Sequence, residues 1–341
     1  MTGLTGEKNV IDYGADPTGV ADSTTAFNNA FAAGPVVVPF GKYLVSNISV
    51  PPRGYIRGNA PLGYVGDSPA GTSSKPVLMA SAGAGAPIFN MTNAHYATIE
   101  GLYLFGNGFG SVGGARGIGS GGNGPTVRDC TIDSFDFGYG DNTSPSGGQL
   151  INNQFMGCNC GISGLEDALV LGGAVSSNQN GIYVWAGATN IIGVRVEFNG
   201  QNGILVGTGS TGSLVQIIGG LMDANAVCGI QVYQSGGVII NGVMFKRSGV
   251  PTNAAGSCHI GINSSVQVIV TGCHTLHTKT DGGSGNDAPS TSVIFAGANS
   301  QIQFVGNYLR GHTTGTWYSG TLPTVDFVNV GNLTYTAERP S

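Results

Sequence analysis

The chain has little charge. Only 9% of its 341 residues are Asp, Glu, Lys or Arg, and 13 basic residues against 18 acidic ones give a formal net charge of −5. A protein that binds nucleic acid carries a basic stripe for the phosphates, so the composition argues against a nucleic-acid partner. No apolar run approaches the ~20 residues of a membrane-spanning helix, so we expect no membrane insertion.

Cysteine is also scarce, and the N-terminus lacks a targeting pattern. Six cysteines are too few for a disulfide scaffold, so buried free thiols are expected. Cys158-x-Cys160 is a weak metal motif, and His274 and His277 have no third ligand nearby, so we expect neither a metal nor a cofactor. The start MTGLTGEKNV has no basic-then-apolar signal peptide, which favours assembly in the cytoplasm over secretion.

Glycine, by contrast, is abundant, with 60 residues, and most of the chain reads as short strands. One segment near the start predicts a helix instead. Asp22 is a suitable N-cap, Gly34 is a suitable stop, and an apolar stripe lies between them. The stripe consists of Ala26, Phe27, Ala30 and Phe31.

Behind this helix the sequence repeats with an irregular period of 20 to 34 residues. Nine segments, from IEGLYLFG to FVGNYLRG, align without gaps and define one inward-facing column. That column reads Leu104, Ile132, Phe155, Val175, Val196, Met222, Met244, His274 and Tyr308. A second repeat, CGISG, NGIYV, NGILV, CGIQV and IGINS, predicts another strand in each period. Two aligned strand sets per period predict an all-β solenoid of about nine or more stacked coils.

Residues 9–50 carry a resemblance to a known family. The pattern hydrophobic-x-Asp-aromatic-Gly-Ala appears at Ile11–Ala15, Asp-Ser-Thr-x-Ala at Asp22–Ala26, and Pro-x-Gly-x-Tyr at Pro39–Tyr43. This region resembles the N-terminal cap of right-handed parallel β-helix proteins of the pectate-lyase-like superfamily, which includes bacteriophage tailspikes. The resemblance implies that the helix covers the open end of the β-helix, where apolar core and unpaired strand edges would otherwise be exposed.

We therefore expect one domain overall. Residues 1–8 would be a short tail or anchor, residues 9–50 the capping helix and first strands, and residues 51–341 the β-helix with its closing segment.

Candidate catalytic residues follow from the alternation of inward and outward side chains. Glu197 and Asp223 are expected on the outer face of adjacent coils, about one strand spacing (~5 Å) apart. Two stacked carboxylates can serve as an acid and a base, although two solvated acids beside Arg195 are the plainer interpretation. Lesser candidates are Asp133, Glu166 and Asp167.

Outward aromatic residues form a second group. Tyr183, Trp185 and Tyr233 follow the Gly-Ile corners, and Trp185 and Tyr233 are expected two coils apart on one face. Together with Arg195 they could bind a glycan or form a trimer interface, because exposed aromatic rings suit both.

The resemblance also implies a function. Family members bind, and often cut, polysaccharides, but the Asn-Thr-Asp, Asp-Asp and Gly-His-Gly motifs of polygalacturonases and the Tyr-Gly-x-Asp-Pro-His motif of mannuronan epimerases are absent. The chain looks most like a phage tailspike that recognises host surface polysaccharide such as O-antigen or capsule. It would then be a homotrimer in the virion, attached through its N-terminus to the phage tail or an adaptor protein. Three alternatives stay open: a depolymerase (hydrolase or lyase), a spike that only binds, or a cellular or secreted polysaccharide lyase, hydrolase or epimerase.

Overall fold

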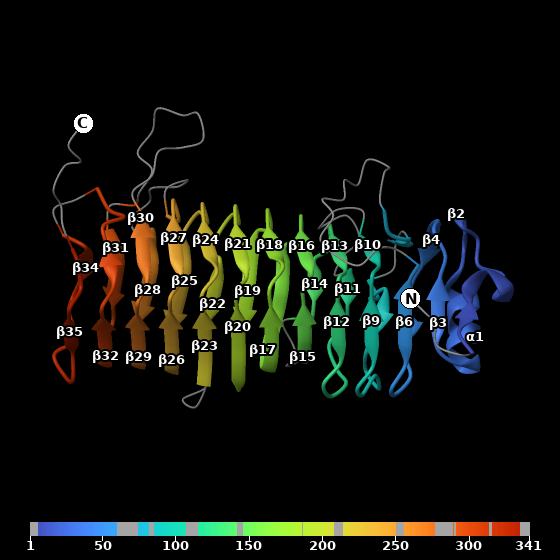
Figure 1. Ribbon diagram of the computed structural model, residues 1–341, viewed down its shortest axis with the longest axis horizontal. Coiled ribbons are helices and arrows are strands. Elements are labelled where there is room, and N and C mark those ends of the chain that lie inside the picture. Colours follow the sequence, from blue (N-terminus) through green and yellow to red (C-terminus); the bar gives the residue numbers. More distant parts are fainter. Residues whose placement is uncertain are drawn as a thin grey trace. The chain divides into compact units, whose positions relative to one another are not determined.

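The computed structural model describes residues 6–59, 74–81, 85–106, 115–141, 146–185, 187–207, 214–249, 256–276, 289, 291–313 and 316–334. The chain divides into two compact units, Met1–Ala174 and Val175–Ser341, here called the first and second unit. Each unit contains three stacks of parallel strands, here called stacks P, Q and R, and the chain visits the stacks in turn (Figure 1). Each unit is thus a parallel β-helix, as the repeats predict.

In the first unit, the stacks contain short strands. Stack P contains β2 (Thr18–Asp22), β4 (Lys42–Val45), β7 (Val77–Ala80), β10 (Tyr103–Phe105), β13 (Thr131–Asp133) and β16 (Gln154–Met156). Stack Q contains β1 (Lys8–Asn9), β3 (Val36–Val38), β6 (Tyr55–Gly58), β9 (Thr98–Glu100), β12 (Thr126–Arg128) and β15 (Ser146–Ile151). Stack R contains β5 (Ile48–Ser49), β8 (Phe89–Asn90), β11 (Arg116–Ile118) and β14 (Phe137–Tyr139), and the long strand β17 (Cys160–Leu171) pairs with both β14 and β15.

The second unit follows the same plan, and β18 (Ala174–Ser176) lies at the boundary in the sequence. Stack P contains β21 (Arg195–Glu197), β24 (Leu221–Asp223), β27 (Met244–Lys246), β30 (His274–Leu276) and β33 (Tyr308–Leu309). Stack Q contains β20 (Ala188–Ile192), β23 (Leu214–Ile218), β26 (Gly236–Asn241), β29 (Val266–Thr271), β32 (Ser300–Val305) and β35 (Val328–Val330). Stack R contains β19 (Asn180–Val184), β22 (Ile204–Val206), β25 (Cys228–Tyr233), β28 (Cys258–Asn263), β31 (Thr291–Ala296) and β34 (Tyr318–Gly320).

The predicted helix is α1 (Thr24–Ala33), which lies at one end of the first unit (Figure 1) and contacts β1, β5 and the 3-10 turn η1 (Val10–Tyr13). Its predicted apolar stripe is buried, and Gly34 ends it. Asp22 accepts a hydrogen bond from the Thr24 amide (2.8 Å), while Ser23 is the N-cap residue itself. Across the described ranges, no helix is long and apolar enough to cross a membrane.

Part of the predicted N-terminal tail belongs to the fold. Lys8–Asn9 forms β1, which pairs with β3, and Glu7 binds Arg57 through two short contacts of 2.7 and 2.8 Å. Residues 1–5 lie outside the described residues.

In both units, the corner that joins a stack Q strand to the next stack P strand has a fixed length. The inward residue near the end of a stack Q strand is followed, five residues later, by the inward residue of the next stack P strand. Two residues into this corner the backbone φ is positive (61° at Gly219 and 54° at Asp129), which explains why Gly, Asp or Asn stands there. The buried pairs include Ile99 and Leu104, Val127 and Ile132, Ile191 and Val196, Ile217 and Met222, and Ile240 and Phe245.

The predicted inward column is correct up to Met222 and wrong from Met244 onward. Met244 and His274 are exposed and Tyr308 is half-buried, all on the outer face. The inward residues of β27, β30 and β33 are instead their neighbours Phe245, Thr275 and Leu309, which are fully buried.

The error has a physical cause in the pair Ile217-Ile218. A gap-free alignment equates Ile218 with Ile240, but the structure pairs Ile217 with Ile240 and Ile218 with Asn241. Ile217 is the inward residue, so the alignment slips by one position, and a one-residue slip exchanges the two faces of a strand.

Candidate functional site

The first unit carries a hollow at a bulge in β17. Ser146 of β15 is paired with Leu165, but Gly148 is paired with Ala168, so Glu166 and Asp167 together oppose the single residue Gly147. Such a bulge leaves extra residues unpaired and redirects their side chains. The positive φ of Asp167 (49°) is consistent with this local distortion.

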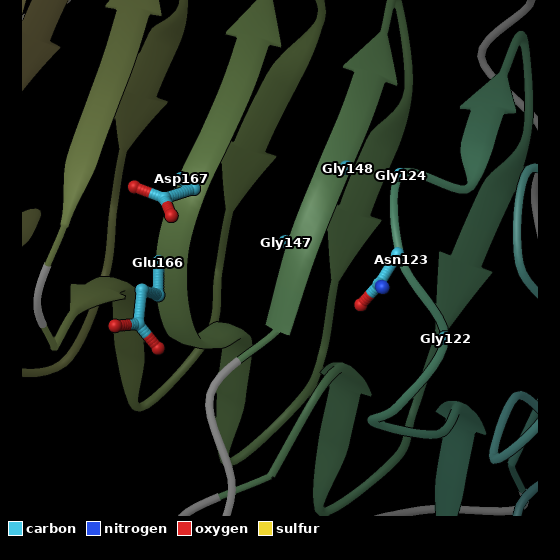
Figure 2. Close-up of a pocket in the computed structure, with 7 residues that line it drawn as sticks. All are labelled: Gly122, Asn123, Gly124, Gly147, Gly148, Glu166 and Asp167. Atoms are coloured by element: carbon cyan, nitrogen blue, oxygen red, sulfur yellow. The ribbon is translucent and has the colours of Figure 1, made fainter.

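The hollow has a volume of about 300 Å³. Its lining consists of Gly122, Asn123, Gly124, Gly147, Gly148, Glu166 and Asp167. Figure 2 shows Asn123 on one side of the strand that carries Gly147 and Gly148, and the two carboxylates on the other side. A polar side chain and two acidic ones thus flank a floor made of glycine backbone.

The floor depends on glycine. A β-carbon added at Gly148 would lie 2.5 Å from the Pro125 carbonyl oxygen, and one added at Gly122 would lie 2.9 Å from that of Met91. Both positions also have positive φ, 125° and 69°. A larger residue would therefore strain the backbone at either position, so the shape of the hollow is set by sequence.

An exposed aromatic ring stands beside the hollow. Tyr96 is 66% exposed, and a β-carbon added at Gly124 would lie 3.4 Å from two of its ring carbons. The Tyr96 amide donates to the Asn123 carbonyl (2.8 Å), and the Asn123 amide donates to Nδ1 of His95 (3.0 Å). Tyr96 has a φ of 57°, which is uncommon for a bulky residue.

This arrangement combines an exposed ring, an amide and two carboxylates around a shallow floor. Carboxylates accept hydrogen bonds from hydroxyl groups, amides both donate and accept, and a flat ring stacks on apolar faces. No hydrogen bond or ion pair to the Glu166 carboxylate is present among the described residues, so it is available to a ligand.

The second unit brings together Glu197 and Asp223, as predicted. They are direct partners on β21 and β24. Each carboxylate is bound by arginine: Nη2 of Arg195 lies 2.8 and 3.0 Å from the two Glu197 oxygens, and Arg247 binds both Asp223 oxygens at 2.8 and 2.6 Å. Asp223 is buried rather than solvated, and Lys246 lies 3.9 Å from it.

The stack P region of the second unit also carries its described basic residues. The four Lys and Arg residues that the structure describes in the second unit all belong to stack P strands or to the residue that follows one. They are Arg195, Lys246, Arg247 and Arg310. The Arg310 guanidinium lies 4.6 Å from the ring centroid of Tyr308, whose ring is stacked with that of His274.

Asp133 lies apart from both places. It is buried on β13, where its carboxylate accepts hydrogen bonds from the Tyr103 hydroxyl and the Ser134 hydroxyl, both at 2.7 Å. Lys75, also buried, donates to Thr131 on the same strand (3.0 Å). The Asp133 carboxylate is therefore held in a closed polar cluster.

The outward aromatics of stack R are half-buried rather than fully exposed. Tyr183 on β19 lies in register with Leu205 on β22 and Gln231 on β25. Trp185 and Tyr233 follow the same alternation, two coils apart. The positions of these three aromatic residues favour neither the predicted glycan contact nor the predicted trimer interface.

No group of three or more His, Cys, Asp or Glu side chains able to hold a metal ion is found within the described part of the chain. Tyr96 and Asn123 were not among the sequence candidates, because they come from different coils and neither belongs to a strand repeat. The run GGNGP at 121–125 is the one sequence signal near them, and it indicates only a turn.

No family model matches the chain. Solved structures do share its fold. The chain is similar to the A-module of a mannuronan C-5 epimerase from Azotobacter vinelandii, with a TM-score of 0.70 and 16% identity over 95% of this chain and 96% of that one. It is equally similar in fold to the enzymatically active domain of tailspike protein 2 of bacteriophage CBA120, with a TM-score of 0.70 and 15% identity over 96% of this chain.

The chain spans 52% of that tailspike domain. A thermostable α-1,3-glucanase catalytic unit from Streptomyces thermodiastaticus aligns with a TM-score of 0.50 and 15% identity, over 98% of this chain and 70% of that one. At these identities the similarities establish the fold. It is the parallel β-helix that phage tailspikes share with polysaccharide-acting enzymes.

Proposed function

We propose that this chain is a tailspike-like protein that recognises polysaccharide on a bacterial surface, and that the hollow at the β17 bulge is its glycan site. The observation that carries the proposal is the exposed Tyr96 ring beside a glycine floor flanked by Asn123, Glu166 and Asp167. Sugar rings have apolar faces that stack on aromatic rings and hydroxyl groups that donate to carboxylates.

The low content of charged residues supports the same proposal. A surface with little charge and many Gly, Ser, Asn and Thr residues suits recognition through hydroxyl groups and close backbone approach. The fold shared with a tailspike supports a phage setting, in which the chain would form a homotrimer in the virion and be attached through its N-terminal residues to the tail or an adaptor protein.

Cleavage of the polysaccharide would need an acid and a base. Glu166 and Asp167 lie in the hollow, whereas Glu197 and Asp223 are each neutralised by an arginine. Both oxygens of each of these two carboxylates already accept hydrogen bonds from a guanidinium. We therefore prefer Glu166, whose carboxylate has no ion pair within the described part of the chain, as the acidic group for any depolymerase activity.

The test mixes the protein with a panel of purified bacterial O-antigens and capsular polysaccharides. Binding is measured by affinity electrophoresis, and chain shortening by size-exclusion chromatography. We expect binding to at least one polysaccharide, and loss of any shortening in Glu166→Gln but not in Glu197→Gln. Absence of binding across the panel would overturn the proposal.

Light scattering on the same sample separates the spike from the alternative. A trimer supports the tailspike assembly. A monomer that still acts on a polysaccharide would instead favour a cellular or secreted lyase, hydrolase or epimerase of the same fold.

A further inference from the structure

Two cysteines of the second unit lie directly against each other. Cys228 opens β25 and Cys258 opens β28, and the parallel pairing of these strands makes the two residues direct partners. Their sulfur atoms are 2.9 Å apart, and both side chains are fully buried.

The strand pairing is compatible with the geometry of a disulfide. Neighbouring parallel strands are ~4.8 Å apart, within the ~4.4–6.8 Å range of Cα separations seen across disulfides. Because the two residues are in register, their side chains leave the sheet on the same side. Closing the sulfurs from 2.9 Å to the ~2.05 Å of a bond needs only small rotations of the side chains.

Cys228 also lies 3.4 Å from Oε1 of Gln231 and 3.6 Å from the Gly256 carbonyl oxygen. The other four cysteines each have a backbone carbonyl oxygen as a hydrogen-bond acceptor at 3.3 to 3.5 Å. They are Cys130, Cys158, Cys160 and Cys273. The thiols of Cys228 and Cys258 thus form the one sulfur–sulfur contact recorded for the described residues.

We propose that Cys228 and Cys258 form a disulfide that cross-links two neighbouring coils of the second unit. The oxidant is a low-molecular-weight disulfide such as oxidised glutathione. The Cys228 thiolate attacks this disulfide and releases one glutathione thiolate, and the Cys258 thiolate then attacks the Cys228 sulfur and releases the second. Two protein thiols are oxidised, two glutathione thiols are formed, and the two protons pass to them.

Burial decides when the bond can form. In the folded core, burial and the neighbouring Cys228 thiol raise the pKa of Cys258 well above its usual value, so thiolate is scarce there. The exchange therefore takes place while this region is open during folding. Once the bond is buried, the same exclusion of solvent protects it from external reductants.

The cross-link has a structural consequence. It spans 30 residues of chain and fixes the register of β25 and β28 at their first residues. It would keep these two coils from separating locally. This inference does not depend on the proposed glycan site.

The test counts thiols by mass spectrometry. The protein is refolded with oxidised glutathione, then denatured and alkylated with iodoacetamide, with or without prior reduction. We expect four alkylated cysteines without reduction and six with it, and a protease-resistant link between the peptides of Cys228 and Cys258. Six alkylated cysteines without reduction would overturn the proposal.

Matched variants keep the result specific. Cys273→Ser should give three alkylated cysteines without reduction and five with it, because the pair is intact. Cys228→Ser should give five in both conditions. The thermal midpoint of the wild type should fall on reduction, whereas that of Cys228→Ser should not change; a link found instead between other cysteines would contradict the assignment.

Discussion

Asp223 and Arg247 form a two-point ion pair on neighbouring coils of the second unit, with Nε–Oδ1 and Nη2–Oδ2 distances of 2.8 and 2.6 Å. Both side chains are less than 10% exposed. The neighbouring pair of Arg195 and Glu197 has similar distances, but the Arg195 side chain is 57% exposed. Both pairs join an arginine to a carboxylate, so comparing them tests how burial changes the contribution of such a pair to stability.

Arg247→Met should lower the free energy of unfolding by about 3 to 5 kcal/mol, because it leaves the buried Asp223 carboxylate without its main partner. Arg195→Met, the matched control, should cost less than about 1 kcal/mol because water replaces the lost contact. Denaturant unfolding followed by circular dichroism measures both. Equal losses in the two variants would contradict the role assigned to burial.

A ladder of buried asparagines runs along the second unit, and Asn199 is its centre. Its Nδ2 donates to Asn225 Oδ1 (2.8 Å) and to the Val175 carbonyl (3.2 Å), and its Oδ1 accepts from the Asn178 amide (3.1 Å). Asn199→Ala leaves these buried groups unpaired and should cost roughly 2 to 4 kcal/mol. Asn241→Ala, at an exposed position, should change stability by less than about 0.5 kcal/mol in the same chemical-unfolding assay.

His259 should make stability depend on pH. Burial, the largest cause, lowers its pKa from 6.5 to about 3, so the folded state favours the neutral ring. The unfolded chain binds the proton first. The stabilisation is therefore complete above pH ~6.5 and is lost as pH falls toward 3, up to roughly 5 kcal/mol.

Thermal melts between pH 4 and 7 measure this slope. His259→Leu should flatten it, because it removes the buried imidazole. His274→Gln, at an exposed position, should keep the wild-type slope. A steep slope that persists unchanged in His259→Leu would refute the assignment.

Tyr96→Ala should weaken polysaccharide binding by roughly fivefold, because a stacked ring contributes about 1 kcal/mol. Phe40→Ala removes another exposed ring of the first unit (67% exposed), away from the hollow, and should leave affinity unchanged. Titration calorimetry with the bound polysaccharide compares the two. A similar effect of both variants would indicate general surface binding instead of stacking at Tyr96.

The fold was predictable because its signals are local. The stripe of α1, the corner glycines and the alternating strands follow from chain geometry within a few residues. The prediction of the inward column failed at Ile217 and Ile218, because either isoleucine could be aligned with Ile240 and only Ile217 pairs with it. The alignment also missed the cysteine pair. It matched Gly229-Ile230 of β25 with Gly261-Ile262 of β28, whereas the structure pairs Ile230 with Ile260 and Cys228 with Cys258, two residues away from that alignment.

The candidate site was predictable only in part. Alternation placed Glu197 beside Asp223, but the guanidinium that neutralises Asp223 comes from position 247, on the next coil. Glu166 and Asp167 were candidates by residue type alone. The bulge that turns them toward a hollow depends on pairing with β15, and Tyr96 reaches its rim from a corner that no repeat marks.

The affinity of the protein for polysaccharide tests the glycan site in the hollow most directly. Calorimetry would compare the wild type, the double variant Glu166→Gln/Asp167→Asn and the control Glu197→Gln on the polysaccharide that the wild type binds. We expect at least a roughly tenfold loss of affinity for the double variant, about 1.4 kcal/mol, and none for the control. Unchanged affinity in the double variant, or a loss only in Glu197→Gln, would place the glycan elsewhere and refute the proposed site.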